Sequence, residues 1–344
     1  MNKFLLVKLS LSVLVAGLAI CGQTSRTCVN QQADEKMLVV MGQAKIDLKP
    51  LASSESSNLT IAQHQYLNFY GVRKAGEHQL GSFPSGDLML AGQFLEPAEK
   101  TEKGTVIMVH GYFDHAYATV NLINYLVGEG YHVAIFDRAG HGLSDGKRVS
   151  ISDFGIYRKG FSDFLDVVSK ECPPPYDVVA HSMGSTVVID HLDKNGTAPI
   201  RRLVFLAPLI KDTKSRGLHL LGTSVSPFAD YLIRIPEENS SNKDYRKFTV
   251  RDPLQFQCIS TRWAVAFNRW RKAFDDSSSR AETPLIIYAG QDTVVDNDFG
   301  REWLSRVFPD REEVEIEGAG HQLLNETAPI RERVLDLISG ELSR

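Results

Sequence analysis

The sequence of 344 residues predicts an α/β fold in which helices cover both faces of a mainly parallel sheet. From Gln79 onward, apolar runs of strand length alternate with amphipathic stretches of helical length. Some runs, such as Thr105–Val109, are apolar at almost every position, as expected for a strand buried on both faces. This alternation is typical of a parallel sheet whose strands are joined by helices.

The expected elements follow one another in a regular order. Strands are expected at residues 87–95, 105–109, 132–136, 176–180, 203–206, 285–288 and 313–316. Helices are expected at residues 117–128, 154–170, 183–194, 261–274 and 328–338. Two helix ends have clear signals, because Pro173-Pro174-Pro175 cannot continue a helix and Asn195-Gly196 is a common C-terminal cap.

One connection is much longer than the others. Between Pro208 and Pro284 there is room for far more than one connecting helix, and much of this segment is apolar. Because structureless loops of this length are uncommon in compact domains, we predict a cap at about residues 209–258. An ordinary irregular loop, without the role of a cap, is the alternative. The residues of the cap expected to contact a substrate are Leu218, Phe228 and Leu232.

Residues 1–21 differ in character from the rest of the chain. Two lysines and no acidic residue precede an apolar stretch from Leu9 to Ile20, which is too short for a comfortable membrane span. We predict a secretory signal peptide, with a buried or anchoring helix as the alternative. The segment ending at Cys21 resembles the lipobox of bacterial lipoproteins, although Ile20 replaces the usual small residue. Lipidation at Cys21 and ordinary cleavage near Ala19 or Gly22 are the two expected outcomes.

Residues 22–77 show little periodicity, so we predict an N-terminal extension with a polar linker at Ser53–Asn58, followed by a catalytic domain at 78–344. Besides Cys21, the chain has Cys28, Cys172 and Cys258. In an oxidising compartment two of these thiols can pair, but the sequence does not say which.

Charge and composition argue against several functions. The net charge is -4 and the pI is near 6.2, whereas nucleic-acid binding needs a strong surplus of basic residues. The histidines are scattered and no metal-binding motif occurs. No glycine-rich dinucleotide fingerprint follows the first strand. We therefore expect no metal, cofactor or nucleic acid.

Two serines lie in pentapeptides that resemble a nucleophile elbow, the sharp strand-turn-helix corner of serine hydrolases. Ser144 has the literal G-x-S-x-G pattern, but it lies beyond its strand and no helical pattern follows it. Ser182, in Ala180-His181-Ser182-Met183-Gly184, follows a predicted strand and opens a predicted helix. A helix N-cap serine is the alternative. We predict that Ser182 is the nucleophile.

A serine hydroxyl needs a base to take its proton, and in this kind of fold an acid and then a histidine follow the serine along the chain. Of the later histidines, His191 lies in a predicted helix and His219 in the predicted cap. His321 lies in a glycine-rich loop after the last strand, so we predict that it is the base. Asp292 follows the strand expected at residues 285–288 and is the predicted acid. Asp296 is the alternative for this role.

The predicted oxyanion hole needs two N–H donors. One is expected from Met183, the residue after the nucleophile, and the other from Tyr112, in the loop that follows the strand Thr105–Val109. Gly111 permits a close approach of the backbone. We expect His110 to be structural, because it precedes the serine in the chain.

Several segments together resemble one family. They are His110–His115, Phe136–Gly146, His181–Gly184, Asp292 and Gly320-His321. This set is similar to the monoacylglycerol lipase and bacterial lysophospholipase group of the α/β-hydrolases, over about residues 80–340. The resemblance implies an α/β-hydrolase fold, a Ser182–His321–Asp292 triad and a cap that forms an apolar tunnel. It also implies that the loop around Ser144 is a structural signature.

Two residues depart from the usual pattern of this group. Ala180 replaces the first glycine of the elbow, and bulky Tyr112 and Phe113 occupy the oxyanion loop. The second departure is expected to narrow the substrate pocket. The expected function is an exported serine hydrolase that cleaves esters of lipids with one acyl chain, either periplasmic, anchored to a membrane through Cys21, or secreted. A general carboxylesterase or peptidase, and a non-catalytic lipoprotein, are the alternatives.

Overall fold

The computed structural model describes residues 28, 30, 32–53, 55–99, 101, 103–213, 229–234, 238–274 and 279–344. The predicted signal peptide with Cys21 and the residues His219, Leu218 and Phe228 lie outside the described residues. Within the described residues, no helix combines the length and the apolar character that crossing a membrane requires.

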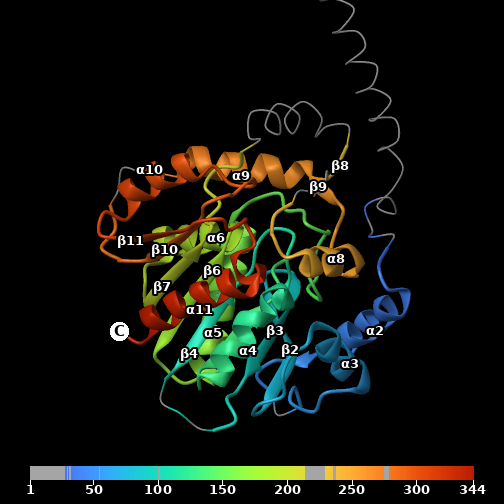
Figure 1. Cartoon of the computed structure of the whole chain (residues 1–344). Helices are drawn as coiled ribbons and strands as arrows, with labels where there is room; N and C mark the ends of the chain where they lie inside the picture. The colour runs from blue at the N-terminus through green and yellow to red at the C-terminus, as the bar shows by residue number, and fades with distance from the viewer. Residues whose placement is uncertain are drawn as a thin grey trace, which may run out of the picture.

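A nine-stranded sheet lies at the centre of the described structure (Figure 1). The order of its strands is β1-β2-β3-β5-β4-β6-β7-β10-β11. They span β1 (Lys49–Pro50), β2 (His78–Ser85), β3 (Leu88–Leu95), β4 (Thr105–Val109), β5 (His132–Phe136), β6 (Tyr176–His181), β7 (Ile200–Leu206), β10 (Leu285–Ala289) and β11 (Glu312–Ile316). Only β3 runs antiparallel to its neighbours β2 and β5. The predicted mainly parallel sheet is confirmed.

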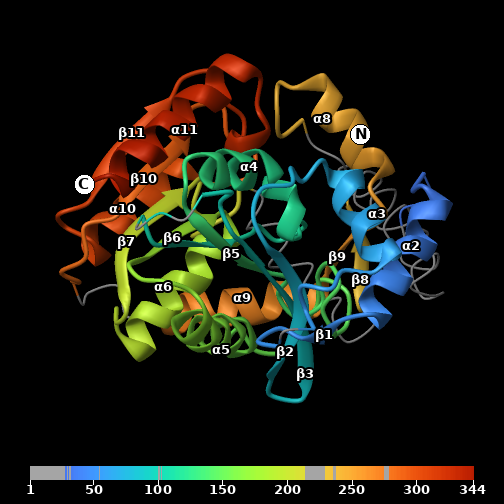
Figure 2. The same cartoon turned by 90° about the horizontal axis from the view of Figure 1, so that it is seen from below.

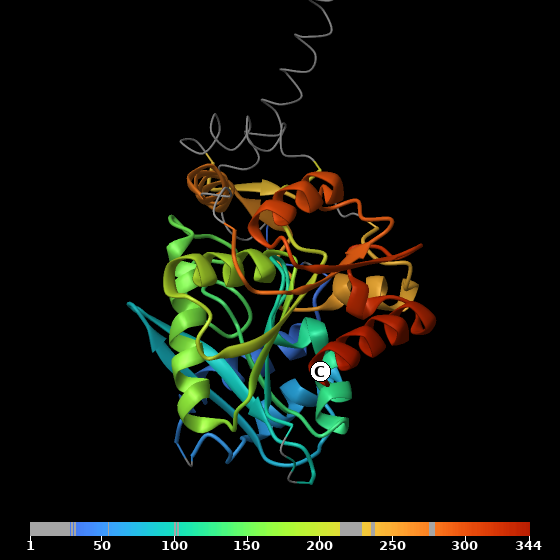
Figure 3. The same cartoon turned by 90° about the vertical axis from the view of Figure 1, so that its left-hand side faces the viewer.

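Helices cover both faces of this sheet. They are α2 (Glu35–Ile46), α3 (Ile61–Tyr70), α4 (Val120–Gly128), α5 (Gly155–Glu171), α6 (Met183–Asn195), α8 (Lys243–Arg251), α9 (Thr261–Ala273), α10 (Asn297–Val307) and α11 (Ala328–Leu342). Figures 2 and 3 show α4 and α11 on one face and α5 and α6 on the other. The core is accordingly divided in two: α5, α6, α9 and α10 pack in one cluster, and α2, α3, α4 and α11 in the other.

Outside the predicted N-terminal extension and the predicted cap, one strand and one α-helix of the described structure were not predicted, β2 and α10. In β2, Gly81 and Pro84 disfavour a strand, yet Gly81 is needed where the chain passes Leu51. A side chain on Gly81 would place its Cβ 2.6 Å from the Leu51 Cα. α10 begins at an N-cap, Asp296, whose carboxylate accepts the Phe299 N–H at 3.1 Å.

The segment 22–77, predicted to be an extension with a linker, contains two helices that pack on the hydrolase domain. Tyr66 and Leu67 of α3 and Met41 of α2 are buried in the same cluster as α4 and α11. Ser56, within the predicted polar linker, is itself buried and donates to the Leu51 carbonyl at 2.8 Å. The weak sequence pattern of residues 22–77 therefore does not mean that they form an independent linker. Their apolar residues pack against parts of the chain that are distant in sequence.

The predicted cap lies between β7 and β10. Its described part contains a small antiparallel pair, β8 (Tyr231–Ile233) and β9 (Cys258–Ser260), with α8 between them along the chain. A disulfide joins Cys28 to Cys258, so the N-terminal segment is tied covalently to the base of the cap. Cys172 is a free thiol.

Candidate active site

Ser182 lies in a strained turn between β6 and α6. Its φ of 53° and ψ of -119° are rare for a residue with a side chain. The turn is held by hydrogen bonds from the Ser182 N–H to the Leu206 carbonyl at 2.8 Å and from the Leu209 N–H to the Ser182 carbonyl at 3.1 Å. Gly184 permits the helix to pass the neighbouring strand, because a Cβ there would lie 2.2 Å from the Val109 carbonyl oxygen.

The structure brings Ser182, His321 and Asp292 together, although 139 residues separate the serine from the histidine. The Ser182 Oγ lies 2.9 Å from His321 Nε2, and His321 Nδ1 lies 2.8 Å from an Asp292 carboxylate oxygen. Ser182 and His321 are each only 4% exposed. An imidazole in this position can accept the serine proton while the carboxylate fixes its tautomer and stabilises its positive charge.

Asp292 is held as a charged group. Burial by itself would raise its pKa, but the adjacent His321 and the N–H groups of Val294 and Val295 outweigh burial and lower the pKa. Those two N–H groups donate to the carboxylate at 2.8 and 3.0 Å. Asp296, the competing acid, instead caps α10 and pairs with Lys211 at 2.5 Å.

Two backbone N–H groups beside Ser182 are available for an oxyanion. Neither the Met183 N–H, at the first position of α6, nor the Tyr112 N–H donates a hydrogen bond to another described residue. The loop of Tyr112 packs against the end of β6, since a Cβ on Gly111 would lie 3.0 Å from the His181 Nδ1. The start of a helix is also a favourable place for negative charge.

The bulky side chains of the oxyanion loop pack towards the cap. The Tyr112 ring stacks on Trp263 of α9 with centroids 3.8 Å apart, and its hydroxyl donates to the Val149 carbonyl at 2.6 Å. Phe113 lies under the Arg234 guanidinium at 4.0 Å. Both aromatic residues therefore help to attach α9 and the end of β8 to the loop.

Two other residues weighed in the sequence analysis occupy structural positions. The buried Ser144 hydroxyl donates to the Asp137 carbonyl and accepts the Ala91 N–H of β3 at 2.8 Å. His110 is fully buried, and burial together with the Arg138 charge holds its pKa well below the usual value. Neither residue makes a hydrogen bond with Ser182 or His321.

The sequence analysis missed the residues that position the His321 loop. The Glu326 carboxylate is fully buried and accepts the Gly320 N–H at 2.8 Å and the Ser241 N–H at 3.0 Å. His181 Nε2 contacts the His321 carbonyl at 3.1 Å, while its Nδ1 lies 3.3 Å from Asp114. Isolated polar residues such as Glu326 carry no local pattern, so only the fold reveals their role.

Burial alone would raise the pKa of Asp114, but the His181 contact and the Gln322 amide outweigh it and lower that pKa well below its usual range. Asp114 therefore stays charged beside His181.

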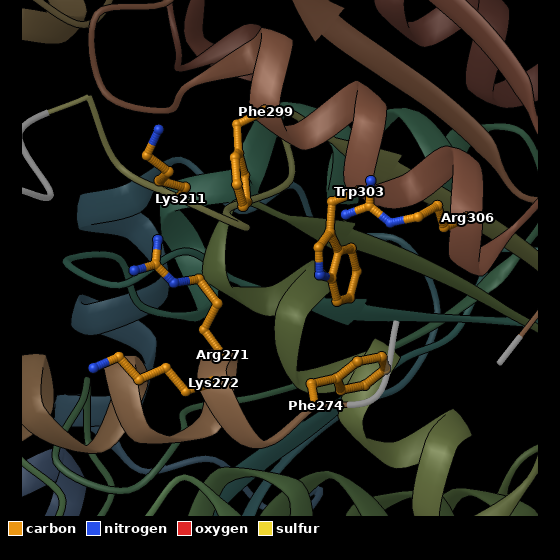
Figure 4. Close-up of a pocket in the computed structure, with 7 residues that line it drawn as sticks. All are labelled: Lys211, Arg271, Lys272, Phe274, Phe299, Trp303 and Arg306. Carbon is orange, nitrogen blue, oxygen red and sulfur yellow. The ribbon is translucent and has the colours of Figure 1, made fainter. Parts of the chain in front are cut away.

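A separate hollow of about 400 Å³ lies between α9, α10 and the chain that follows β7 (Figure 4). Four cationic side chains and three aromatic rings line it, and Ser182, His321 and Asp292 are not among them. Of the predicted cap residues, Leu232 is described: it lies half-buried on β8, opposite Ile259 of β9. Within the described residues, no group of three or more His, Cys, Asp or Glu side chains could hold a metal ion.

Comparison with known proteins places the chain in a family. A family model described as serine aminopeptidase, S33, matches residues 100–328. The chain is 26% identical over 244 residues to a monoglyceride lipase homolog of monkeypox virus, covering 68% of this chain and 87% of that protein. It is 24% identical over 241 residues to the phospholipase YtpA of Bacillus subtilis, covering 67% and 91%.

Solved structures share the fold. A soluble variant of monoglyceride lipase from Saccharomyces cerevisiae, in complex with a substrate analogue, matches with a TM-score of 0.68 at 19% identity, covering 79% of this chain and 97% of that one. A monoacylglycerol lipase of Paleococcus ferrophilus matches with a TM-score of 0.63 at 22% identity, covering 74% and 98%. The match to the family model spans more than half of the chain, and the chain therefore belongs to the serine aminopeptidase S33 family and is an α/β-hydrolase of the monoglyceride lipase and lysophospholipase type.

Proposed function

We propose that this protein is an exported serine hydrolase that cleaves carboxylic esters of lipids with a single acyl chain, such as monoacylglycerols or lysophospholipids. The observation that carries the proposal is the pair of contacts from Ser182 Oγ to His321 Nε2 at 2.9 Å and from His321 Nδ1 to Asp292 at 2.8 Å. This arrangement can activate a serine for attack on an ester carbonyl.

In the proposed mechanism, His321 takes the Ser182 proton as the oxygen attacks the carbonyl carbon. The negative charge that forms on the carbonyl oxygen is stabilised by the N–H groups of Tyr112 and Met183. The imidazolium, held by Asp292, then gives its proton to the departing alcohol, which leaves an acyl-serine. Water, activated by His321, hydrolyses this ester in the same way and releases the fatty acid.

The proposed substrate class rests on similarity to known lipid hydrolases and on the apolar sequence of the predicted cap. The relatives include proteins named for monoglyceride and phospholipid hydrolysis. The sequence of the predicted cap is rich in apolar residues, of which Leu232 is described. We propose that Leu218, Phe228 and Leu232 receive the acyl chain.

The proposed export rests on two separate observations. The N-terminal 21 residues have the charge and length of a signal peptide. The Cys28–Cys258 disulfide also suits an oxidising compartment outside the cytoplasm. Lipidation at Cys21 would hold the enzyme at a membrane surface, close to lipid substrates. The mass of the mature chain from its native host tests this point, because a chain that begins at Gly22 or later excludes the anchor.

A chain-length series tests the substrate class. Each methylene that enters an apolar site contributes about 0.8 kcal/mol, so four added carbons should raise kcat/KM by roughly two orders of magnitude. Leu232→Asp should remove much of this gain and leave acetate ester hydrolysis in place. The measurement compares p-nitrophenyl esters from acetate to decanoate for both proteins. A flat wild-type series would instead favour a general carboxylesterase or a peptidase.

A fluorophosphonate probe tests catalysis itself. It should label Ser182 in the wild-type protein, and the adduct can be located by mass spectrometry. Absence of labelling and of hydrolysis across monoacylglycerols, lysophospholipids and short esters would favour a non-catalytic lipoprotein.

A further inference from the structure

Arg138 is a buried cation directly behind the oxyanion loop. It follows β5 and Asp137, its side chain is fully buried, and its guanidinium lies over the Tyr157 ring at 5.1 Å. Within the described residues, neither the triad nor the predicted cap makes a hydrogen bond with it. Its position is therefore not explained by the chemistry derived so far.

The Arg138 guanidinium is directed at one carbonyl group, that of Gly111. Its Nη2 donates to the Gly111 oxygen at 2.6 Å. His110 Nδ1 lies 2.9 Å from the same oxygen. The Asp114 N–H also donates to it, at 3.2 Å. One carbonyl thus accepts three hydrogen bonds, one of them from a buried positive charge.

The tautomer of His110 follows from its second ring nitrogen. The Arg138 backbone N–H donates to His110 Nε2 at 3.2 Å, so this nitrogen carries no proton. Nδ1 must then hold the proton and donate to Gly111, which agrees with the lowered pKa of His110. The Arg138 guanidinium and the His110 imidazole therefore both donate to the same oxygen.

The positive charge of Arg138 makes no direct ion pair among the described residues, and the carboxylates of Asp114 and Asp137 favour it only from a distance. Its Nε and Nη1 have no hydrogen-bond partner in the described residues, and none of the ion pairs found among those residues includes it. Burial lowers the pKa of Arg138 to about 10, which leaves the group protonated at neutral pH. A buried guanidinium without a direct ion-pair partner is costly to the fold.

The Gly111 carbonyl belongs to the same peptide group as the Tyr112 N–H. Hydrogen bonds to the oxygen of a peptide draw electron density away from its nitrogen and make the N–H a stronger donor. We propose that Arg138 and His110 polarise the Gly111–Tyr112 peptide, and that Arg138 thereby acts as a positioning residue that strengthens the Tyr112 half of the oxyanion hole. This inference rests on the proposed function, since it needs an oxyanion at Tyr112.

The charge of Arg138 would act mainly in the transition state. The ester carbonyl of the substrate carries little charge before attack, whereas the tetrahedral intermediate carries a full negative charge. Loss of Arg138 should therefore lower kcat with little change in KM. A purely structural residue would instead affect stability and substrate binding together.

The test compares three variants of the full chain. Arg138→Met removes both charge and donor, while Arg138→Gln removes the charge but keeps an N–H donor. The matched control is Arg148→Met, because Arg148 is also a mostly buried guanidinium that donates to a backbone carbonyl, that of Gly142, at 2.7 Å. Kinetics use a soluble p-nitrophenyl ester, and the transition-state analogue is a trifluoromethyl ketone with the same acyl chain.

Removal of a whole oxyanion donor costs about 10²–10³-fold in kcat, so weakening one should cost roughly 10–100-fold. We expect this loss for Arg138→Met, a smaller loss for Arg138→Gln, and an inhibition constant for the ketone that rises by the same factor as kcat falls. Arg148→Met should leave kcat and that constant unchanged. If Arg138→Met does not fold, as judged by circular dichroism, the same comparison is made on Arg138→Gln.

Two results would overturn the inference. One is a folded Arg138 variant with wild-type kcat and wild-type ketone affinity. The other is a fall in kcat that is matched by a lower unfolding temperature but not by weaker ketone binding. In either case fluorophosphonate labelling of Ser182 in the wild type would show that the serine hydrolase activity on which the inference rests still stands. Absence of that labelling would mean that the proposed function itself has failed.

Discussion

At the scale of single residues, the conformation of Ser182 is the most informative feature. A serine at φ 53° is maintained only when its surroundings enforce it, here through backbone hydrogen bonds to Leu206, at the end of the neighbouring strand β7, and to Leu209, in the loop that follows. Strain of this kind clusters at functional sites. It exposes the Oγ to His321 at the start of α6, rather than letting the hydroxyl cap the helix, since Ser182 makes no side-chain cap.

The two serines in elbow-like sequences should respond differently to substitution. Ser182→Ala should lower kcat by roughly 10⁴-fold or more, because the nucleophile is lost, and should leave the unfolding temperature nearly unchanged. Ser144→Ala should retain turnover but lose about 1–3 kcal/mol of stability, because the Ala91 N–H and Asp137 carbonyl lose a buried partner. Steady-state kinetics and urea unfolding measure both. An adduct on Ser144 would contradict the assignment.

The ionisation of Asp292 makes the free energy of unfolding depend on pH. Its folded pKa lies below the ordinary value of 3.8, so its charge stabilises the fold above about pH 4, and that contribution is lost as the pH falls through the folded pKa. The difference in free energy of unfolding between wild type and Asp292→Asn should therefore shrink between pH 6 and pH 3. Asp292→Asn should also lower kcat by about 10⁴-fold at neutral pH. A difference in stability that does not vary with pH would argue against a charged Asp292.

At the scale of elements, the contact between α6 and β4 determines where Ser182 lies. The helix approaches the strand so closely that only glycine fits at position 184. The bounds of α6 and β4 were predictable because each of these elements has a continuous local pattern. The close approach of α6 to β4 requires glycine at position 184. This glycine is the last residue of the pentapeptide Ala180–Gly184, so the sequence already contains it.

Gly184→Ala should therefore be strongly harmful. Its methyl group would meet the Val109 carbonyl, so α6 must shift and carry Ser182 away from His321. We expect a loss of at least about 1–3 kcal/mol in stability and a large loss of kcat. The control is Gly300→Ala in α10, where nothing lies within 4 Å of the new Cβ, and where alanine should be neutral or slightly stabilising. Equal effects at both positions would refute the packing argument.

At the scale of the whole molecule, the N-terminal segment is joined to residues 250–258, which lie at the end of α8 and after it; these contacts are called the clamp below. Asn30 donates to the Val250 carbonyl at 2.8 Å, and the Tyr70 hydroxyl donates to the buried Asp252 carboxylate at 2.6 Å. His115 Nε2 contacts the other oxygen of Asp252 at 2.9 Å. The family match begins at residue 100, so this clamp is built by a part of the chain outside it.

The Cys28–Cys258 disulfide should strengthen this clamp. It closes a loop across 230 residues, and removal of such a link typically costs about 2–5 kcal/mol. Cys28→Ser with Cys258→Ser should thus lower the free energy of unfolding by this amount, and reductant should do the same to the wild type. Cys172→Ser, which removes a free thiol, should have little effect on either measurement. Insensitivity of the wild type to reductant would mean that the bond does not form.

The sequence by itself determined the fold class, most of the strands and helices after residue 78, and the serine and histidine proposed for the triad. Strand and helix patterns are local, and the elbow and the His321 loop are short segments with recognisable neighbours. Such features depend on contacts between residues that are close along the chain. They can therefore be read without knowledge of the three-dimensional arrangement.

Only the tertiary structure decided which acid faces His321, how residues 22–77 pack and which cysteines pair. Asp292 and Asp296 follow the same strand, and the difference between them is that one meets His321 and the other Lys211. The three hydrogen bonds on the Gly111 carbonyl likewise come from separate segments. These contacts join residues far apart in sequence, and their free energy comes from burial and pairing that exist only after the chain has folded.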